Sequence, residues 1–344
     1  MNSGAISMAD HGGKQGWRAA FRLLAAALLC LGGALSGADP SPEERAVAYL
    51  AREVPLWSRQ NHCFSCHNNG DGARALYAAR RLSYPLPEEA LADTTRWLIR
   101  PSQWDHTRGD AGFSDQKLAR IQFAASLTEA FAAGLVEDTK VLLEAAESLL
   151  PHQSADGSWA VDGKVAVGSP ATYGSWLATY LARRTLERSG HARFQDAIAR
   201  ADHWFLEKPV SSQLDAAATV LALADRRSAK AESKLKDSLE MLVRGQTSEG
   251  GWGPYLNSPP EPFDTAVVLL AFGSLPPRSE IPARIERGRA YLARTQLPSG
   301  GWPETTRPPG AQSYAQHIST AGWATLALLE TRSVGTFRRQ DSKR

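Results

Sequence analysis

Apolar residues recur along this chain at spacings of three and four, the pattern of amphipathic helices, and no segment alternates convincingly as a strand does. Ser41-Pro42-Glu43-Glu44 combines a capping box with a proline at the first helical position, which predicts a helix from there to about Trp57. Prolines and glycines punctuate the joints that follow. The later helices are predicted at about 71–82, 87–100, 114–133, 136–150, 170–188, 192–207, 211–225, 229–244, 261–275, 279–295 and 312–331. The chain is therefore predicted to be all-α and built from six helical pairs.

The turns inside these pairs repeat a sequence in which glutamine is followed by one or two glycines and then tryptophan. The clear copies are Gln153 to Trp159, Gln246 to Trp252 and Gln296 to Trp302, with degenerate copies starting at Gln60 and Gln103. The glutamine amide is expected to bond loop backbone or the next helix, the glycines to allow positive φ, and the tryptophan to cover a helix end. The repeat thus indicates six structural units, the first with its own version of the turn after Gln60.

At these turns the chain resembles the squalene–hopene cyclase and protein prenyltransferase superfamily, whose QW repeats build an α/α toroid. Three further segments carry the resemblance, which extends over about residues 86–331: Gly157-Ser158-Trp159 with Tyr173-Gly174-Ser175-Trp176, Asp264-Thr265-Ala266-Val267-Val268, and Ser319-Thr320-Ala321-Gly322-Trp323-Ala324. The resemblance implies an inner ring of helices around a cavity, with the turns grouped at one end.

The catalytic motifs of that superfamily are incomplete in this chain. The cyclase acid motif is replaced by Glu261-Pro262-Phe263-Asp264, and Phe263 cannot deliver the proton. Asp264 remains a weak catalytic candidate, although an aspartate in the first turn of a helix is also an ordinary capping residue. The prenyltransferase zinc set is broken too, because no cysteine lies near Asp264 and His317 is out of register. Cyclisation and prenyl transfer are therefore disfavoured.

A cavity for an isoprenoid or another lipid is a separate hypothesis, because it needs only an apolar wall. If the second helix of each pair is the inner one, its aromatic residues either line the cavity or pack in the core. The candidates are Phe123, Tyr173, Trp176, Tyr180, Phe263, Tyr314, His317 and Trp323.

The segment after Gln60 contains Cys63-Phe64-Ser65-Cys66-His67, which is C-x-x-C-H, the attachment signature of a c-type haem. Two thiols on one helical turn reach the two vinyl groups of one porphyrin, and the following histidine ligates the iron. Cys63, Cys66 and His67 are thus predicted to bind one covalent haem c. A zinc knuckle, a thioredoxin-like redox pair and a plain disulfide are the alternatives.

The sixth iron position is not defined by the motif. Met241 is the only methionine after the first 38 residues, and it belongs to the fifth unit, so a His/Met pair is not expected. His106, in the turn of the second unit, is a possible distal ligand. His317 is the other histidine that a closed ring would bring near, and an open position is the third possibility.

The N-terminus predicts export. Lys14, Arg18 and Arg22 precede an apolar run to Leu35, and Ser36-Gly37-Ala38 fits a signal-peptide cleavage site. Cleavage there leaves Cys63 and Cys66 as the only cysteines of a periplasmic protein; retention by an uncleaved N-terminal anchor is the alternative. No transmembrane span is expected after cleavage. The small net charge of +3 gives no basic field for nucleic acid.

The domain organisation follows as a signal peptide (1–38), a haem-attachment segment that is the first helical pair (39–85), the toroid repeats (86–333) and a basic tail (334–344). A small cytochrome unit joined to a separate five-pair ring is the alternative. Three functions are compatible with the sequence: electron transfer or redox sensing with an unidentified redox partner, haem-dependent oxidation of a hydrophobic substrate in the cavity, and lipid binding without catalysis.

Overall fold

The computed structural model describes residues 39–106, 116–161, 174–276, 280–305 and 313–332. The chain from Pro40 onward forms one compact unit. The predicted signal peptide and basic tail lie outside the described residues, as does Tyr173. Within the described residues, no helix is both long enough and apolar enough to cross a membrane.

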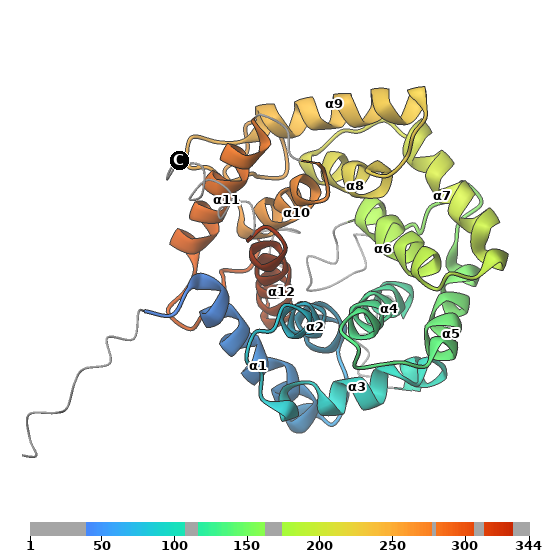
Figure 1. Cartoon of the computed structure of the whole chain (residues 1–344), viewed down its shortest axis with the longest axis vertical. Helices are drawn as coiled ribbons and strands as arrows, with labels where there is room; N and C mark the ends of the chain where they lie inside the picture. Colours follow the sequence, from blue (N-terminus) through green and yellow to red (C-terminus); the bar gives the residue numbers. More distant parts are fainter. Residues whose placement is uncertain (1–38, 107–115, 162–173, 277–279, 306–312, 333–344) are drawn as a thin grey trace, which may run out of the picture. The chain divides into compact units, whose positions relative to one another are not determined.

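The helices of this unit form two concentric rings, and the described residues contain no strand (Figure 1). The outer helices are α1 (Pro42–Asn61), α3 (Ala92–Leu98), α5 (Thr139–Leu149), α7 (Gln195–Glu207), α9 (Ala229–Gly245) and α11 (Ile281–Thr295). The inner helices are α2 (Ala73–Arg81), α4 (Gln116–Ala132), α6 (Gly174–Arg188), α8 (Gln213–Leu223), α10 (Pro262–Gly273) and α12 (Tyr314–Glu330). The prediction of an all-α toroid of six pairs, with the second helix of each pair inside, is confirmed.

Composition explains which helix of each pair lies inside. The inner helix α10 is apolar on almost every side, with Phe263 to Leu269 all buried, and such a helix has to be covered on all its faces. The outer helices are amphipathic: α9 buries Leu235, Leu239 and Leu242 on one side and leaves charged residues on the other. A ring of apolar helices inside a ring of amphipathic helices follows from these two patterns.

Several short elements refine the predicted boundaries. The second helix, predicted from about residue 71, is α2 from Ala73, and the π-helical η1 (Cys66–Gly72) runs directly into it. The predicted helix at 87–100 is divided into the 3-10 turn η2 (Glu88–Ala90) and α3, because the backbone of Leu91 leaves helical geometry at φ −122°. The remaining 3-10 turns are η3 (Pro101–His106), η4 (Leu150–His152) and η6 (Ala192–Phe194).

The repeated turn holds neighbouring outer helices together, as its sequence predicted. The Nε2 atom of Gln153 donates to the carbonyl oxygens of Gly157 (2.9 Å) and Ala197 (2.8 Å), the latter in α7. The indole nitrogen of Trp159 donates to the carbonyl oxygen of Leu149 (2.8 Å), at the end of α5. Gln246 and Trp252 make the same bonds to the α11 and α9 residues Arg284 and Leu242.

The third copy of the turn closes the ring on the first helix. Nε2 of Gln296 donates to the carbonyl oxygen of Pro42 (2.9 Å), and Arg45 in α1 donates back to Oε1 of Gln296 (2.6 Å). Gly300 has a φ of +98°, and a Cβ there would lie 2.4 Å from the carbonyl oxygen of Arg45. Residues 39–85 are therefore held as the first unit of the toroid by the same device as the later units.

Candidate functional site

The C-x-x-C-H segment connects α1 to α2 and is fixed by side-chain hydrogen bonds. The backbone N–H of Ser65 donates to Oδ1 of Asn69 (2.8 Å), and the hydroxyl of Ser65 accepts from the N–H of Asn68 (3.1 Å). Nδ2 of Asn69 donates to the hydroxyl of Thr94 (2.8 Å) in α3, and Nδ2 of Asn68 donates to the carbonyl oxygen of Glu53 (2.8 Å) in α1. The segment is thus tied to the helices on both sides.

The two thiols and the imidazole differ in exposure. Cys63 and Cys66 are partly exposed and are not joined by a disulfide. His67 is buried, and its Nε2 atom has no hydrogen-bond partner among the described residues. Burial lowers the pKa of His67 to about 3, so the imidazole is neutral at ordinary pH. A neutral imidazole with an unpartnered nitrogen has the electronic state that an axial metal ligand needs.

Aromatic side chains surround His67. The rings of Trp57 and Tyr314 stack on each other at 5.6 Å and both meet the imidazole edge-on, at 4.8 and 5.8 Å between centroids. The hydroxyl of Tyr314 donates to Oε2 of Glu53 (2.9 Å) and accepts from Nδ2 of Asn68 (3.0 Å). Tyr314 comes from the last inner helix, so ring closure places it on His67 of the C-x-x-C-H segment, and no local sequence signal points to it.

The two histidines considered as distal ligands, His106 and His317, lie in different elements. His106 ends η3, and its side chain lies outside the described residues. His317 contacts the ring of Tyr49 at 5.8 Å and lies 3.7 Å from a carboxylate oxygen of Glu304. Tyr49 and Trp57 are about 12 Å apart along α1, from the rise per residue of a helix. The ring and ion-pair contacts of His317 are thus with Tyr49 and Glu304 and not with the imidazole of His67. Within the described residues, no group of three or more His, Cys, Asp or Glu side chains is placed to hold a metal ion.

Asp264 lies in the first turn of α10 and is completely buried, next to Phe263, whose ring meets Trp323 at 5.8 Å. Asp264 therefore stays a candidate catalytic residue, and its position alone assigns it no role. Two other candidate cavity residues, Phe123 and Trp176, pack outward: Phe123 against Trp97 at 4.4 Å, and Trp176 against Trp204 at 4.6 Å.

The inner ring also contains a buried polar network that sequence reasoning missed. Nε2 of Gln122 donates to Oδ2 of Asp71 (2.8 Å). Burial raises the pKa of Asp71 to about 6, opposed by the charge of Arg74 and by hydrogen bonds from Ser319, Gln122 and Trp323. The guanidinium of Arg74 lies 4.2 Å above the ring of Trp323. Asp71 and Arg74 are three residues apart, and this spacing in the sequence could have indicated that both side chains lie on the same face of a helix.

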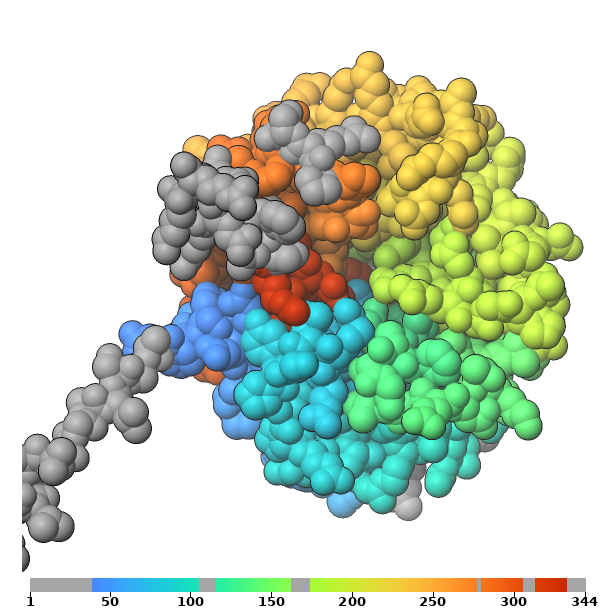
Figure 2. All heavy atoms as spheres, viewed as in Figure 1, coloured from blue at the N-terminus to red at the C-terminus, as the bar shows by residue number. Residues whose placement is uncertain are grey.

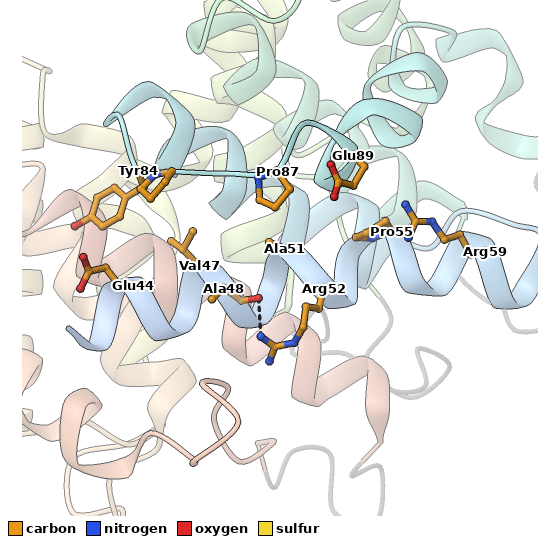
Figure 3. Close-up of a pocket in the computed structure, with 11 residues that line it drawn as sticks. Glu44, Val47, Ala48, Ala51, Arg52, Pro55, Arg59, Tyr84, Pro87 and Glu89 are labelled. Carbon is orange, nitrogen blue, oxygen red and sulfur yellow. Dashed lines mark hydrogen bonds between the residues drawn. The ribbon is translucent and has the colours of Figure 1, made fainter. Parts of the chain in front are cut away.

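Two hollows lie near these groups. A cavity of about 790 Å³ inside the ring is lined by residues that include Arg74, Tyr180 and Trp323, so two of the aromatic candidates do face a cavity. A groove of about 460 Å³ follows α1 on the outside, between Val47, Ala51 and Pro55 and the Tyr84–Pro87 connection (Figure 3).

Comparison with solved structures supports the toroid. The type II terpene cyclase MstE from Scytonema is 12% identical, with a TM-score of 0.54 over 85% of this chain and 99% of MstE. A variant of MstE in complex with its substrate geranylgeranyl dihydroxybenzoate gives the same identity and coverage, with a TM-score of 0.53. A protein from Actinoplanes is 16% identical, with a TM-score of 0.50 over 85% of this chain and 99% of its own. No protein-family profile matches the sequence, and a search of curated proteins gives no match. These likenesses establish the fold.

Proposed function

We propose that this chain carries one haem c, bound covalently through Cys63 and Cys66 with His67 as the axial ligand, and that it acts in electron transfer or redox sensing after export. The observation that carries the proposal is the buried, unpartnered Nε2 atom of His67 directly beside the two thiols of a C-x-x-C-H motif. A bound c-type haem supplies reversible one-electron chemistry at its iron.

The residues present fit this group in three ways. The thiols are partly exposed and are not joined in a disulfide, as thioether formation needs. His67 is neutral and is held by its aromatic neighbours Trp57 and Tyr314, so little reorientation entropy is lost on ligation. Asn68 and Asn69 fix the backbone on either side of the motif through Glu53 and Thr94. The chain therefore presents its three attachment atoms on a preorganised segment.

The decisive experiment is a pyridine haemochrome spectrum and a haem stain after denaturing electrophoresis, on protein expressed with the cytochrome c maturation machinery. We expect one haem per chain that stays with the polypeptide. The Cys63→Ala/Cys66→Ala variant is expected to be colourless, and His62→Ala, a neighbouring exposed histidine, to stain as strongly as the original. A colourless original chain would remove the redox proposal.

A second candidate function is binding of a hydrophobic ligand inside the ring, either for oxidation beside the haem or without catalysis. The shared fold with MstE, a terpene cyclase solved with geranylgeranyl dihydroxybenzoate, favours it. Spectral shifts with CO or cyanide separate an open haem site from a saturated electron carrier. Solvent extraction of the purified protein followed by mass spectrometry tests for the ligand.

A further inference from the structure

The cavity inside the ring opens at the carboxyl ends of the inner helices, and the face of the ring drawn in Figure 2 is hollowed at its centre. Helix carboxyl ends carry partial negative charge, and arginines gather there. Six arginines line the cavity: Arg74, Arg81, Arg183, Arg184, Arg188 and Arg226. Four carboxylates line it with them: Glu129, Glu187, Asp225 and Glu330.

Most of these arginines are held by carboxylates. Arg184 donates to Glu129 (3.0 Å), and Arg81 pairs with Glu330. Arg183 and Arg226 both pair with Asp202, which stands just outside the lining. With Asp71 and Asp202 added, the acids about equal the arginines in number. The cavity is therefore close to neutral. Each of these four guanidinium groups already pairs with at least one carboxylate, although Nε of Arg226 is buried without a hydrogen-bond partner among the described residues.

Arg74 and Arg188 make no such ion pair among the described residues. Arg188 lies on the exposed rim, whereas Arg74 lies at the inner wall of the cavity, close to Asp71. Arg74 is 4% exposed, and its Nη1 atom is buried without a hydrogen-bond partner among the described residues. An arginine stays charged in proteins, and leaving one of its buried donors unmet is costly. Its stacking on Trp323 fixes the guanidinium plane without using an N–H group. A donor held in this way is suited to an acidic group of a ligand.

We propose that the cavity binds an amphiphilic carboxylate, whose acid group pairs with Arg74 and whose apolar part lies along Trp323, Leu326 and Leu221. This inference deepens the second candidate function and rests on it, because it names the class of ligand that the ring holds. Trp323 packs on Arg74, and Leu326, Leu221, Leu270 and Ala222 supply further apolar surface to the same cavity. The volume of about 790 Å³ lies within the range of small-molecule pockets.

The near-neutral charge of the cavity indicates whether the acid group of the ligand is a carboxylate or a phosphate. A phosphate monoester brings close to two negative charges, and Glu129 and Asp71 already stand near Arg74. Either group can pair with the guanidinium of Arg74, but these acids repel a doubly charged phosphate more strongly than a singly charged carboxylate. A singly charged carboxylate is thus the better match.

The cavity is separate from the haem motif. Tyr314, which packs on His67, and Trp323, which packs on Arg74, stand about 13 Å apart along α12. The ligand is therefore expected to bind whether or not haem is attached, and a test on both forms distinguishes it from a propionate of the cofactor.

The test is isothermal titration calorimetry with three probes that share one alkyl chain: dodecanoate, dodecyl phosphate and dodecanol. The haem-loaded protein and the Cys63→Ala/Cys66→Ala variant are both titrated after delipidation. We expect dodecanoate to bind both forms at least tenfold more tightly than the other two probes. Arg74→Gln is expected to weaken dodecanoate binding about 10- to 100-fold, while Arg188→Gln, on the exposed rim of the same cavity, changes it less than threefold.

Each contrary result has a distinct meaning. Equal binding of dodecanol and dodecanoate overturns the role of Arg74 but keeps a hydrophobic ligand. Binding of dodecanoate only to the haem-free variant overturns the inference, because the cofactor then supplies the carboxylate. Absence of binding by all three probes overturns both the inference and the second candidate function. The comparison of probes on the unaltered cavity needs no variant, so it stands even if Arg74→Gln fails to fold.

Discussion

Replacing Gly300 by alanine tests whether the first unit, which contains the C-x-x-C-H segment, is an integral part of the ring. The backbone at Gly300 has a φ of +98°, which costs a residue with a side chain about 1–2 kcal/mol. The added Cβ would also lie 2.4 Å from the carbonyl oxygen of Arg45 and 3.0 Å from Cβ of Tyr49. Overpacking against backbone costs about 1–3 kcal/mol.

The shift needed to relieve that clash would loosen the hydrogen bonds between Gln296, Pro42 and Arg45, each worth about 0.5–1.5 kcal/mol. Together these effects predict that Gly300→Ala lowers the free energy of unfolding by about 3–5 kcal/mol. The loss arises between the last turn and α1, so it is expected only if residues 39–85 are docked in the ring.

Gly134→Ala is the matched control. Gly134 also has a positive φ, +71°, but a Cβ there meets nothing within 4 Å. Only the backbone cost of about 1–2 kcal/mol is expected. Urea denaturation followed by circular dichroism measures both variants. If Gly300→Ala is no more destabilising than Gly134→Ala, α1 is not held by the last turn, and the six-unit ring is refuted.

Three further predictions follow from individual contacts. Trp252→Phe removes a buried 2.7 Å bond to the carbonyl oxygen of Leu242, and it is expected to lower the free energy of unfolding by about 1–3 kcal/mol, measured by urea denaturation; Tyr255→Phe, an exposed position, should have no effect. Asp71 has a folded-state pKa raised to about 6 from 3.8, so its contribution to stability is present below pH 4 and is lost as the pH rises to 6. The stability of the original chain relative to Asp71→Asn should therefore fall by about 3 kcal/mol between pH 4 and pH 7, and a difference independent of pH would contradict the assignment. Tyr314→Phe loses the hydrogen bonds to Glu53 and Asn68, so the haem-loaded variant should show a changed reduction potential or Soret band with unchanged covalent haem content; identical spectra and potential would mean that Tyr314 does not position His67.

The sequence by itself determined the repeating part of the molecule. Helical periodicity identified the six pairs, and the glutamine, glycine and tryptophan of each clear turn act within a few residues of one another, so their spacing alone fixed their roles. The same locality makes the C-x-x-C-H pattern of Cys63, Cys66 and His67 recognisable, because its three residues lie within five positions and the pattern needs no distant partner.

Only the tertiary structure decided what surrounds these local features. Tyr314 lies on His67, and Trp323 lies under Arg74, because closing the ring brings the last helix against the first pair. Periodicity shows which face of a helix is buried, but it does not say which residue of a distant helix it will meet. The same limit explains why Phe123 and Trp176 pack outward while Tyr180 faces the cavity: the direction of a side chain on a helix buried all round is set by the packing of its neighbours.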